Sequence, residues 1–294
     1  MHFIKKKVST LQYYNNKKTK LSQQKFTVDL LKIFLYNKYK GDKTMIYITG
    51  DIHGEPNRLN KHSFYEQDEM TKNDYVIILG DFGLIWDKEM SKNEKYWLNW
   101  LDEKPFTTLF IDGNHENHKR LNSYNVESWN GGKIHKINDS VFHLMRGQVF
   151  EIDNKKIFTF GGARSHDIQG GVLDTNDKDY PEKLRKAKEG YLPFRIKDLS
   201  WWEEEMPNKA EMAEGLINLE KNNNEVDYIL THCCASSTQT LYSGGFYESD
   251  ELTKYFDDIR AKVKFKKWFF GHYHDNKMIN TEEYMLYEQI IRIS

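Results

Sequence analysis

Side chains that can bind metal ions follow five short apolar runs of the sequence. The runs and the residues after them are IYITG before Asp51 and His53, VIILG before Asp81, LFIDG before Asn114 and His115, YILT before His232, and WFFG before His272 and His274. Imidazole, carboxylate and amide groups in combination are ligands of divalent transition metals. The pattern therefore predicts a metal centre built from distant parts of the chain.

The size and chemistry of this set indicate how many ions it binds and of which kind. It is too large for one tetrahedral ion and suits two ions that share a bridging ligand, for which Asp81 is the natural choice. A histidine-rich set without thiolates matches Ca or Mg alone poorly, so we expect manganese, or iron with zinc. Two ions roughly 3.5–4 Å apart are the usual arrangement for in-line displacement at phosphorus. The predicted chemistry is metal-dependent hydrolysis of a phosphoric ester.

The spacing within two pairs also favours a shared centre. Asp51 and His53 are two residues apart, and so are His272 and His274. In an extended segment this spacing places both side chains on one side. Each motif alone has a simpler explanation as a turn with an incidental histidine, but five motifs in order after five apolar runs predict one site.

The apolar runs have the length of buried strands, and helical patterns fall between them. Strands are predicted over 45–49, 75–79, 108–111, 228–230 and 267–270, and helices after Ser91, over 208–219 and over 249–259. Ser91 and Glu94 form a predicted capping box. Alternating strands and helices favour a parallel or mixed sheet, whose carboxyl edge is where ligands bind. We therefore expect the metal-binding side chains to meet at that edge.

Two regions differ from this alternation. Strand-like runs over 141–145, 148–152 and 156–160, separated by turn residues, predict a meander within 133–160. Residues 165–199, the lid segment, are rich in Gly, Asp and Lys with little periodicity, so we expect a surface excursion or lid there.

The motifs together resemble the signature of calcineurin-like metallophosphoesterases. They are GDIHG at 50–54, GDFG at 80–83, GNHE at 113–116, THCC at 231–234 and GHYH at 271–274. The resemblance covers nearly everything from Met45 onward. It implies an α/β fold, a mixed β-sandwich flanked by α-helices. It further implies that the first metal is held by Asp51, His53 and His274, the second by Asn114, His232 and His272, and that Asp81 bridges them.

The resemblance also gives His115 a separate role. It implies that His115 is not a ligand but steadies the phosphoryl oxygens or protonates the leaving group, an effect typically worth about 10²–10⁴-fold. Metal coordination lowers the pKa of water from 15.7 to about 7, so we expect a hydroxide to attack phosphorus near neutral pH. Protein serine/threonine phosphatases of this superfamily carry an Asp where this chain has Leu84. Asp167 is a candidate to orient His115 in its place.

Other residues near the motifs have weaker assignments. Arg164 follows the run IFTF in a Gly-Gly turn and could bind a substrate phosphate through its guanidinium, although a surface arginine in a tight turn explains the pattern equally well. The pair Trp201 and Trp202 is expected to pack rather than to bind substrate. Cys233 and Cys234 are adjacent, which disfavours a disulfide between them and favours a reducing compartment.

Charge is divided unevenly along the 294 residues. Residues 1–44 carry 11 lysines against two aspartates, and residues 45–294 have a net charge of −10. An acidic body disfavours extended nucleic-acid binding, which depends on Lys and Arg contacts to phosphates. We therefore expect a small phosphorylated substrate, such as a nucleotide. A nuclease acting on DNA or RNA ends and an inactive metal-binding scaffold are the alternatives.

The basic extension at 1–44 allows three interpretations. It is a disordered arm, a helix that docks on an acidic partner, or translated sequence upstream of a start at Met45, which we favour because a core-like strand follows at once. The metallophosphoesterase domain is then 45–294. No run approaches the roughly 18 apolar residues of a membrane span, so we expect a cytoplasmic protein without a membrane partner. The sequence does not predict its oligomeric state.

Overall fold

The computed structural model describes residues 43–294, of which Thr44–Ser294 form one compact unit. Predictions for the basic extension lie outside the described residues, and the division of the chain at Met45 stays a prediction. None of the described helices has the length and apolar character that crossing a bilayer requires.

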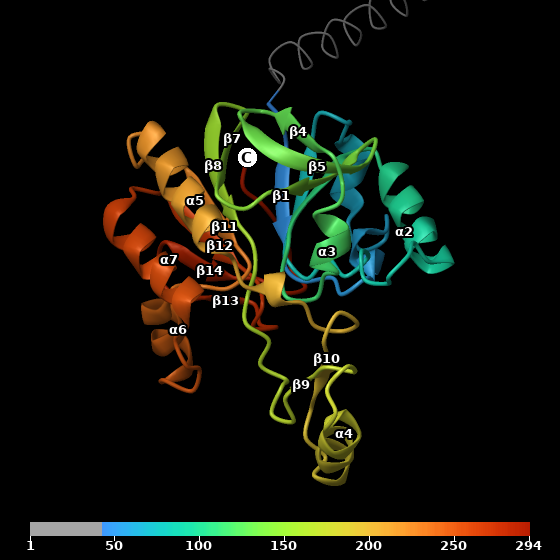
Figure 1. Ribbon diagram of the computed structural model, residues 1–294. Helices are drawn as coiled ribbons and strands as arrows, with labels where there is room; N and C mark the ends of the chain where they lie inside the picture. The colour runs from blue at the N-terminus through green and yellow to red at the C-terminus, as the bar shows by residue number, and fades with distance from the viewer. Residues whose placement is uncertain (1–42) are drawn as a thin grey trace, which may run out of the picture. The chain divides into compact units, whose positions relative to one another are not determined.

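Two sheets pack face to face in this unit (Figure 1). Within residues 43–294, one sheet has seven strands in the order β15-β1-β2-β3-β6-β5-β4, and the other has six in the order β13-β14-β12-β11-β8-β7. The first contains β1 (Ile46–Thr49), β2 (Tyr75–Leu79), β3 (Thr107–Ile111), β4 (Val126–Trp129), β5 (Gly132–Asn138), β6 (Val141–Leu144) and β15 (Ile290–Arg292). The second contains β7 (Gln148–Ile152), β8 (Lys155–Phe160), β11 (Tyr228–Thr231), β12 (Lys267–Phe270), β13 (Lys277–Met278) and β14 (Glu283–Met285).

Helices cover the outer faces of both sheets (Figure 1). They are α2 (Lys92–Asp102), α3 (His118–Leu121), α5 (Lys209–Lys221), α6 (Ser236–Ser243) and α7 (Glu251–Lys262), with short 3-10 turns η1 (Pro56–Leu59), η2 (Tyr65–Glu69) and η3 (Glu203–Glu205). The predicted fold class, a mixed β-sandwich flanked by helices, is confirmed.

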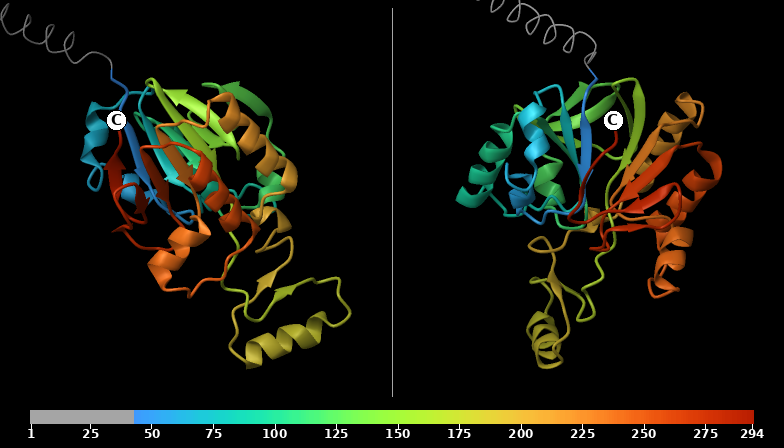
Figure 2. Two further views of the ribbon diagram at one scale, coloured as in Figure 1. Left: turned by 90° about the vertical axis from the view of Figure 1, so that its left-hand side faces the viewer. Right: turned by 180° about the vertical axis from the view of Figure 1, so that it is seen from behind.

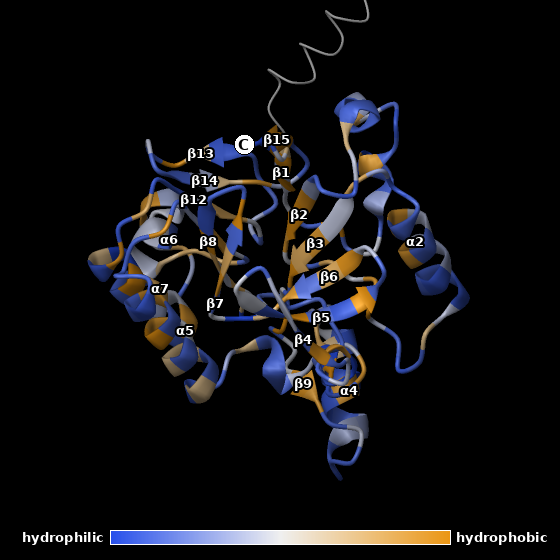
Figure 3. Cartoon of the chain, turned by 90° about the horizontal axis from the view of Figure 1, so that it is seen from above, coloured by the Kyte–Doolittle hydropathy of each residue, from blue (hydrophilic) through white to orange (hydrophobic). Residues whose placement is uncertain are grey.

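The central strands are apolar on both faces because the other sheet covers one face and helices cover the other. Ile48 pairs with Ile77 and Ile77 with Leu109 in parallel register, and these side chains pack between the sheets with Leu230 and Phe269. Figure 3 shows this apolar interior, with hydrophilic loops around it. Parallel strands buried on both faces appear in a sequence as continuous apolar runs. This is why the sequence predicted these strands, and all five are present in the structure.

One helix start differs from its prediction. The Ser91 side chain accepts a hydrogen bond from the Glu94 amide, as a cap should, but the reciprocal half of the capping box is missing. The Glu94 carboxylate binds Arg120 of α3 instead. A complete capping box does form at α5, between Asn208 and Glu211.

The meander prediction is wrong in its connectivity. β5 and β6 pair with each other, and β7 and β8 pair with each other, but the two hairpins belong to different sheets. Parallel partners determine this division, because β6 pairs with β3 whereas β8 pairs with β11. The chain therefore changes sheets between Leu144 and Gln148.

The lid segment projects from the sandwich (Figure 2). It contains β9 (Val172–Leu173) and β10 (Arg195–Ile196), paired in parallel, and the helix α4 (Tyr180–Glu189) between them. The sequence did not predict α4 because Ala187 is its one buried residue, so it lacks an apolar stripe.

Candidate metal centre

The structure places all seven predicted ligands at the carboxyl ends of neighbouring strands. Asp51 and His53 follow β1, Asp81 follows β2, Asn114 follows β3, His232 follows β11, and His272 and His274 follow β12. The centre therefore joins the edges of both sheets, where the lid segment also begins after β8.

A first group of donor atoms converges from Asp51, His53, Asp81 and His274. These four atoms all lie within 4.8 Å of one another. Nε2 of His274 is 3.0 Å from Nε2 of His53 and 3.3 Å from Oδ2 of Asp51, and Nε2 of His53 is 3.8 Å from Oδ2 of Asp81. Donors bonded to one ion at about 2.0–2.2 Å are spaced by roughly 3–4 Å. The arrangement fits a metal ion.

A second group lies on the other side of Asp81. Nε2 of His232 is 3.2 Å from Oδ1 of Asp81 and 3.3 Å from Oδ1 of Asn114. Nδ1 of His232 donates to the Leu79 carbonyl at 2.8 Å, so Nε2 is the nitrogen that could give up its proton and bind a metal ion. The His272 ring lies 5.0 Å from the His232 ring. This group also suits a metal ion.

Asp81 has one carboxylate oxygen toward each group, which suits a bridging ligand. Oδ1 also accepts a hydrogen bond from the His115 amide at 2.8 Å. Burial raises the pKa of Asp81, but His232 and the other histidines outweigh burial and hold it well below its usual range. Burial likewise lowers the pKa of His232, yet Asp81 and Asp51 raise it to about 10. A proton between Asp81 and His232 thus occupies a place that a cation can take.

The backbone at these residues is strained. His53, Asp81, His272 and His274 have positive φ angles of 46°, 44°, 71° and 51°. Left-handed conformations are uncommon for residues other than glycine and gather at functional sites. The two paired motifs are therefore tight turns, which corrects the prediction that they are extended segments.

Two glycines let the loops approach the ligands. A Cβ atom at Gly113 would lie 2.1 Å from Oδ1 of Asp81, and one at Gly271 would lie 2.2 Å from Oδ1 of Asp51. Any side chain at either position would displace a predicted ligand.

Asn114 is oriented by residues that the sequence did not reveal. Its Nδ2 donates to Oγ of Ser165 at 3.3 Å, so Oδ1 is the atom that faces His232. Ser165 in turn donates to Oε2 of Glu205 at 2.6 Å, and its amide donates to Oε1 at 2.9 Å. The start of the lid segment and Glu205, which follows the segment in the chain, are thereby connected to a predicted ligand.

Glu116 clamps two of the ligand loops together. Its carboxylate accepts hydrogen bonds from the amides of Phe82 at 2.6 Å, Gly83 at 3.3 Å and Gly113 at 2.7 Å. Burial, and then the nearby Asp81, raise the pKa of Glu116 to about 8. Glu116 is the last residue of the GNHE motif, and this position is the only feature of the sequence that could have indicated its role.

His115 lies beside the first donor group. Its ring contacts that of His53 edge-on at 4.8 Å and stacks on Trp86 at 5.7 Å. Trp202 is buried and packs against Trp86, as expected for a packing residue. Burial lowers the pKa of His115.

The orientation of His115 differs from the predicted arrangement. Leu84, at the position where related phosphatases carry Asp, is buried. Asp167 is near, but it reaches His115 through a third residue, Arg195. Nε of Arg195 donates to Oδ1 of Asp167 at 3.0 Å, and Nη2 of Arg195 lies 3.2 Å from Nε2 of His115.

Hollows flank the centre on both sides. One of about 330 Å³ is lined by His53, Trp86, Glu94 and His115 among others. The other, of about 500 Å³, is lined by Arg164, His166, Phe246 and Tyr247 among others, and the His166 ring lies 4.9 Å from the His272 ring. Arg164 is 54% exposed, and its Nε lies 3.7 Å from Oδ2 of Asp250. Cys233 and Cys234 are buried and not disulfide-bonded.

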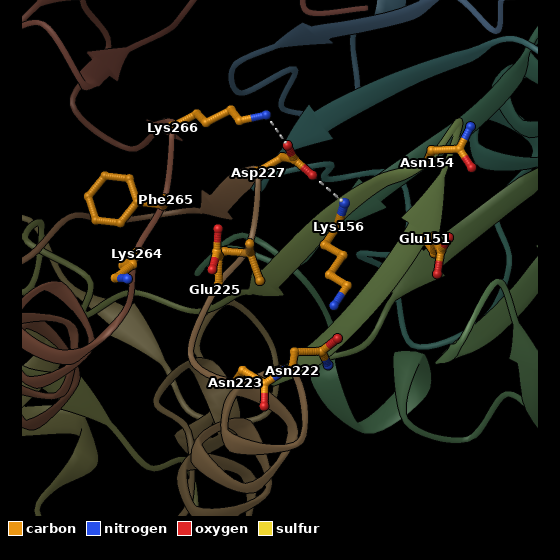
Figure 4. Close-up of a pocket in the computed structure, with 11 residues that line it drawn as sticks. Glu151, Asn154, Lys156, Asn222, Asn223, Glu225, Asp227, Lys264, Phe265 and Lys266 are labelled. Carbon is orange, nitrogen blue, oxygen red and sulfur yellow. Dashed lines mark hydrogen bonds and ion pairs between the residues drawn. The ribbon is translucent and has the colours of Figure 1, made fainter.

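A further hollow lies at the opposite edge of the second sheet (Figure 4). It is lined by residues at the amino ends of β8, β11 and β12, including Lys156, Asp227 and Lys266. Asp227 is paired with Lys266 at 2.6 Å and accepts from the Lys156 amide. This hollow has no part in the metal centre.

Comparison with known proteins agrees with the geometry. The model of the family described as calcineurin-like phosphoesterase matches residues 44–276. No curated protein matches the chain. Members of this family hydrolyse phosphoric esters and typically bind two metal ions. The chain therefore belongs to the calcineurin-like phosphoesterase family and is a metal-dependent phosphoric ester hydrolase.

Proposed function

We propose that this enzyme hydrolyses a small phosphomonoester or phosphodiester, such as a nucleotide, at a centre of two divalent ions. The observation that carries the proposal is the convergence of donor atoms from Asp51, His53, Asp81 and His274 within 4.8 Å of one another. The second ion would be held by Asn114, His232 and His272, with Asp81 between the two.

Metal ions held there would supply an activated water molecule and neutralise charge on the phosphoryl oxygens. We propose manganese, or iron with zinc, because the donors are mostly imidazole and carboxylate. The protein's part is to fix these donors before substrate arrives. Strained turns at His53 and His274 and the clamp of Glu116 supply that rigidity.

His115 is the proposed acid. Its half-buried ring stands beside the first donor group with Nε2 directed away from the backbone of the ligand loops, toward the lid segment. A proton held at Nε2 can pass to the leaving oxygen or form a hydrogen bond to a phosphoryl oxygen. Stacking on Trp86 holds the ring in place.

The substrate is expected to be small. The two hollows beside the centre have volumes of about 330 and 500 Å³, which suit small molecules. Arg164 and the exposed Phe246 line the larger one, so we propose that Arg164 contacts the substrate's leaving group there. A negatively charged body makes extended nucleic acid a poor substrate, and we propose that the enzyme acts in the cytoplasm.

A screen of phosphate esters tests this proposal. Protein loaded with Mn, Fe or Zn, with metal content measured alongside, would be assayed with p-nitrophenyl phosphate, its bis ester and nucleotides. We expect hydrolysis by the wild type, none above background by Asp81→Asn, and full activity from Asp139→Asn, an exposed turn carboxylate. Metal-loaded protein that is inert toward every ester would overturn the proposal.

A further inference from the structure

An arginine of the lid segment reaches the centre. Arg195 belongs to β10, and its backbone amide donates to Gly171 within the lid segment. Its side chain is only 15% exposed, because the guanidinium lies against His115. Arg195 and His115 are 80 positions apart in the sequence.

Asp167 fixes the direction of this guanidinium. It accepts a hydrogen bond from Nε of Arg195 at 3.0 Å and another from Nη2. Asp167 thus occupies the edge formed by Nε and Nη2. The terminal edge, formed by Nη1 and Nη2, is left to face His115, and no group within residues 43–294 hydrogen-bonds Nη1. Because Asp167 occupies the other edge, the terminal edge is the one left to bind a phosphate through two parallel hydrogen bonds.

Arg195 contacts the nitrogen of His115 that the proposed function directs at the substrate. A guanidinium only donates, so Nε2 of His115 accepts at 3.2 Å. The same nitrogen would face a phosphoryl group in the proposed function. When a phosphoryl group lies beside His115, its oxygens therefore come within reach of the Arg195 terminal edge.

We propose that Arg195 binds the phosphoryl oxygens of the substrate through its terminal edge and so fastens the lid segment over the bound phosphate, with Asp167 as the positioning residue. This inference rests on the proposed function. It assigns phosphate binding to Arg195 rather than to Arg164, whose nearest acidic partner is Asp250 and whose side chain is mostly exposed.

Affinity for inorganic phosphate is the direct test. Isothermal calorimetry on metal-loaded protein would compare wild type with Arg195→Ala, Arg195→Lys and Asp167→Asn. Loss of charge-assisted hydrogen bonds predicts about 10- to 100-fold weaker phosphate binding for Arg195→Ala. Arg195→Lys keeps the charge but cannot form two parallel hydrogen bonds, so its phosphate affinity should lie between those of the wild type and Arg195→Ala. Asp167→Asn should weaken phosphate binding less than Arg195→Ala does.

The matched control is Arg185→Ala, another arginine of the lid segment, which is exposed and pairs with Glu189 on α4. It should bind phosphate as the wild type does. Metal content is measured for each variant. Weaker phosphate binding at unchanged metal content supports the inference, and it should be matched by a rise in KM for p-nitrophenyl phosphate.

Two results would overturn the inference. One is phosphate affinity in both Arg195 variants equal to that of the wild type, and the other is a fall in affinity fully explained by lost metal. If the metal-loaded wild type neither binds phosphate nor hydrolyses any ester, the proposed function itself fails. An active wild type with unaffected Arg195 variants removes only the role of Arg195.

Discussion

Nε2 of His53 and Nε2 of His274 lie 3.0 Å apart, although the residues are 221 positions apart in the sequence. Two ring nitrogens at this distance, with the carboxylates of Asp51 and Asp81 beside them, present electron-rich atoms to one point. Both histidines adopt left-handed backbone conformations to achieve this. Strain of this kind persists where the surrounding structure enforces it, and it is typical of functional sites.

His115→Ala should retain its metal ions and lose turnover. The His115 ring is not one of the predicted metal ligands, so its removal should leave metal binding intact. Acid catalysis, by contrast, is worth about 10²–10⁴-fold in rate. Turnover and metal content measured on the same preparation check this. Activity equal to that of the wild type would remove His115 from the mechanism.

Ser165→Ala should weaken metal binding without unfolding the protein. Ser165 holds the amide of Asn114, and loss of such an outer partner typically costs about 10–100-fold in metal affinity. Competition with a chelator measures the affinity. Ser128→Ala, on the exposed strand β4, is the control and should bind metal normally. Unchanged affinity in Ser165→Ala would show that Asn114 is oriented without it.

Above pH 8, where the Glu116 carboxyl is ionised, Glu116→Gln should destabilise the metal-free protein by about 1–3 kcal/mol, because an amide NH₂ then faces a backbone N–H that has lost its acceptor. Urea unfolding of the metal-free protein gives the free energy of unfolding. The exposed Glu103→Gln should leave it unchanged. Equal stability of Glu116→Gln and wild type would mean that the clamp contributes nothing.

A buried histidine pair should make stability depend on pH. Nδ1 of His135 lies 3.0 Å from Nδ1 of His143, and burial followed by His143 lowers the pKa of His135 from its ordinary 6.5 to about 4. Between these values the unfolded chain binds the proton and the folded protein does not. The contribution of His135 to stability is therefore complete above pH 6.5 and is lost as the pH falls toward 4.

Unfolding of the metal-free protein at pH 7 and at pH 4.5 checks this dependence. His135→Gln should lose less stability between the two than the wild type does, by about 2 kcal/mol. An identical loss in both proteins would contradict the assignment.

The sequence predicted the parts of the site that follow the central strands. Strands such as β2 and β12 are buried on both faces, so their apolar runs are unbroken and the polar ligands after them stand out. The sequence could not assign the strands within 133–160 to two different sheets, because an alternating pattern does not show which strand pairs with which. Ser165 and Arg195 were missed since their roles depend on contacts across a segment with little periodicity. Asp167 was predicted to orient His115 in place of the missing carboxylate; it lies near His115 but connects to it through Arg195, which is visible only in three dimensions.

The central claim is that two ions share Asp81. A crystal structure of manganese- or zinc-loaded protein with anomalous diffraction at the metal edge tests it most directly. We predict two peaks roughly 3.5–4 Å apart. One should lie within bonding distance of Asp51, His53 and His274, the other of Asn114, His232 and His272, and both of Asp81. Metal-loaded crystals with no peak between these side chains, or with a single peak away from Asp81, would contradict it.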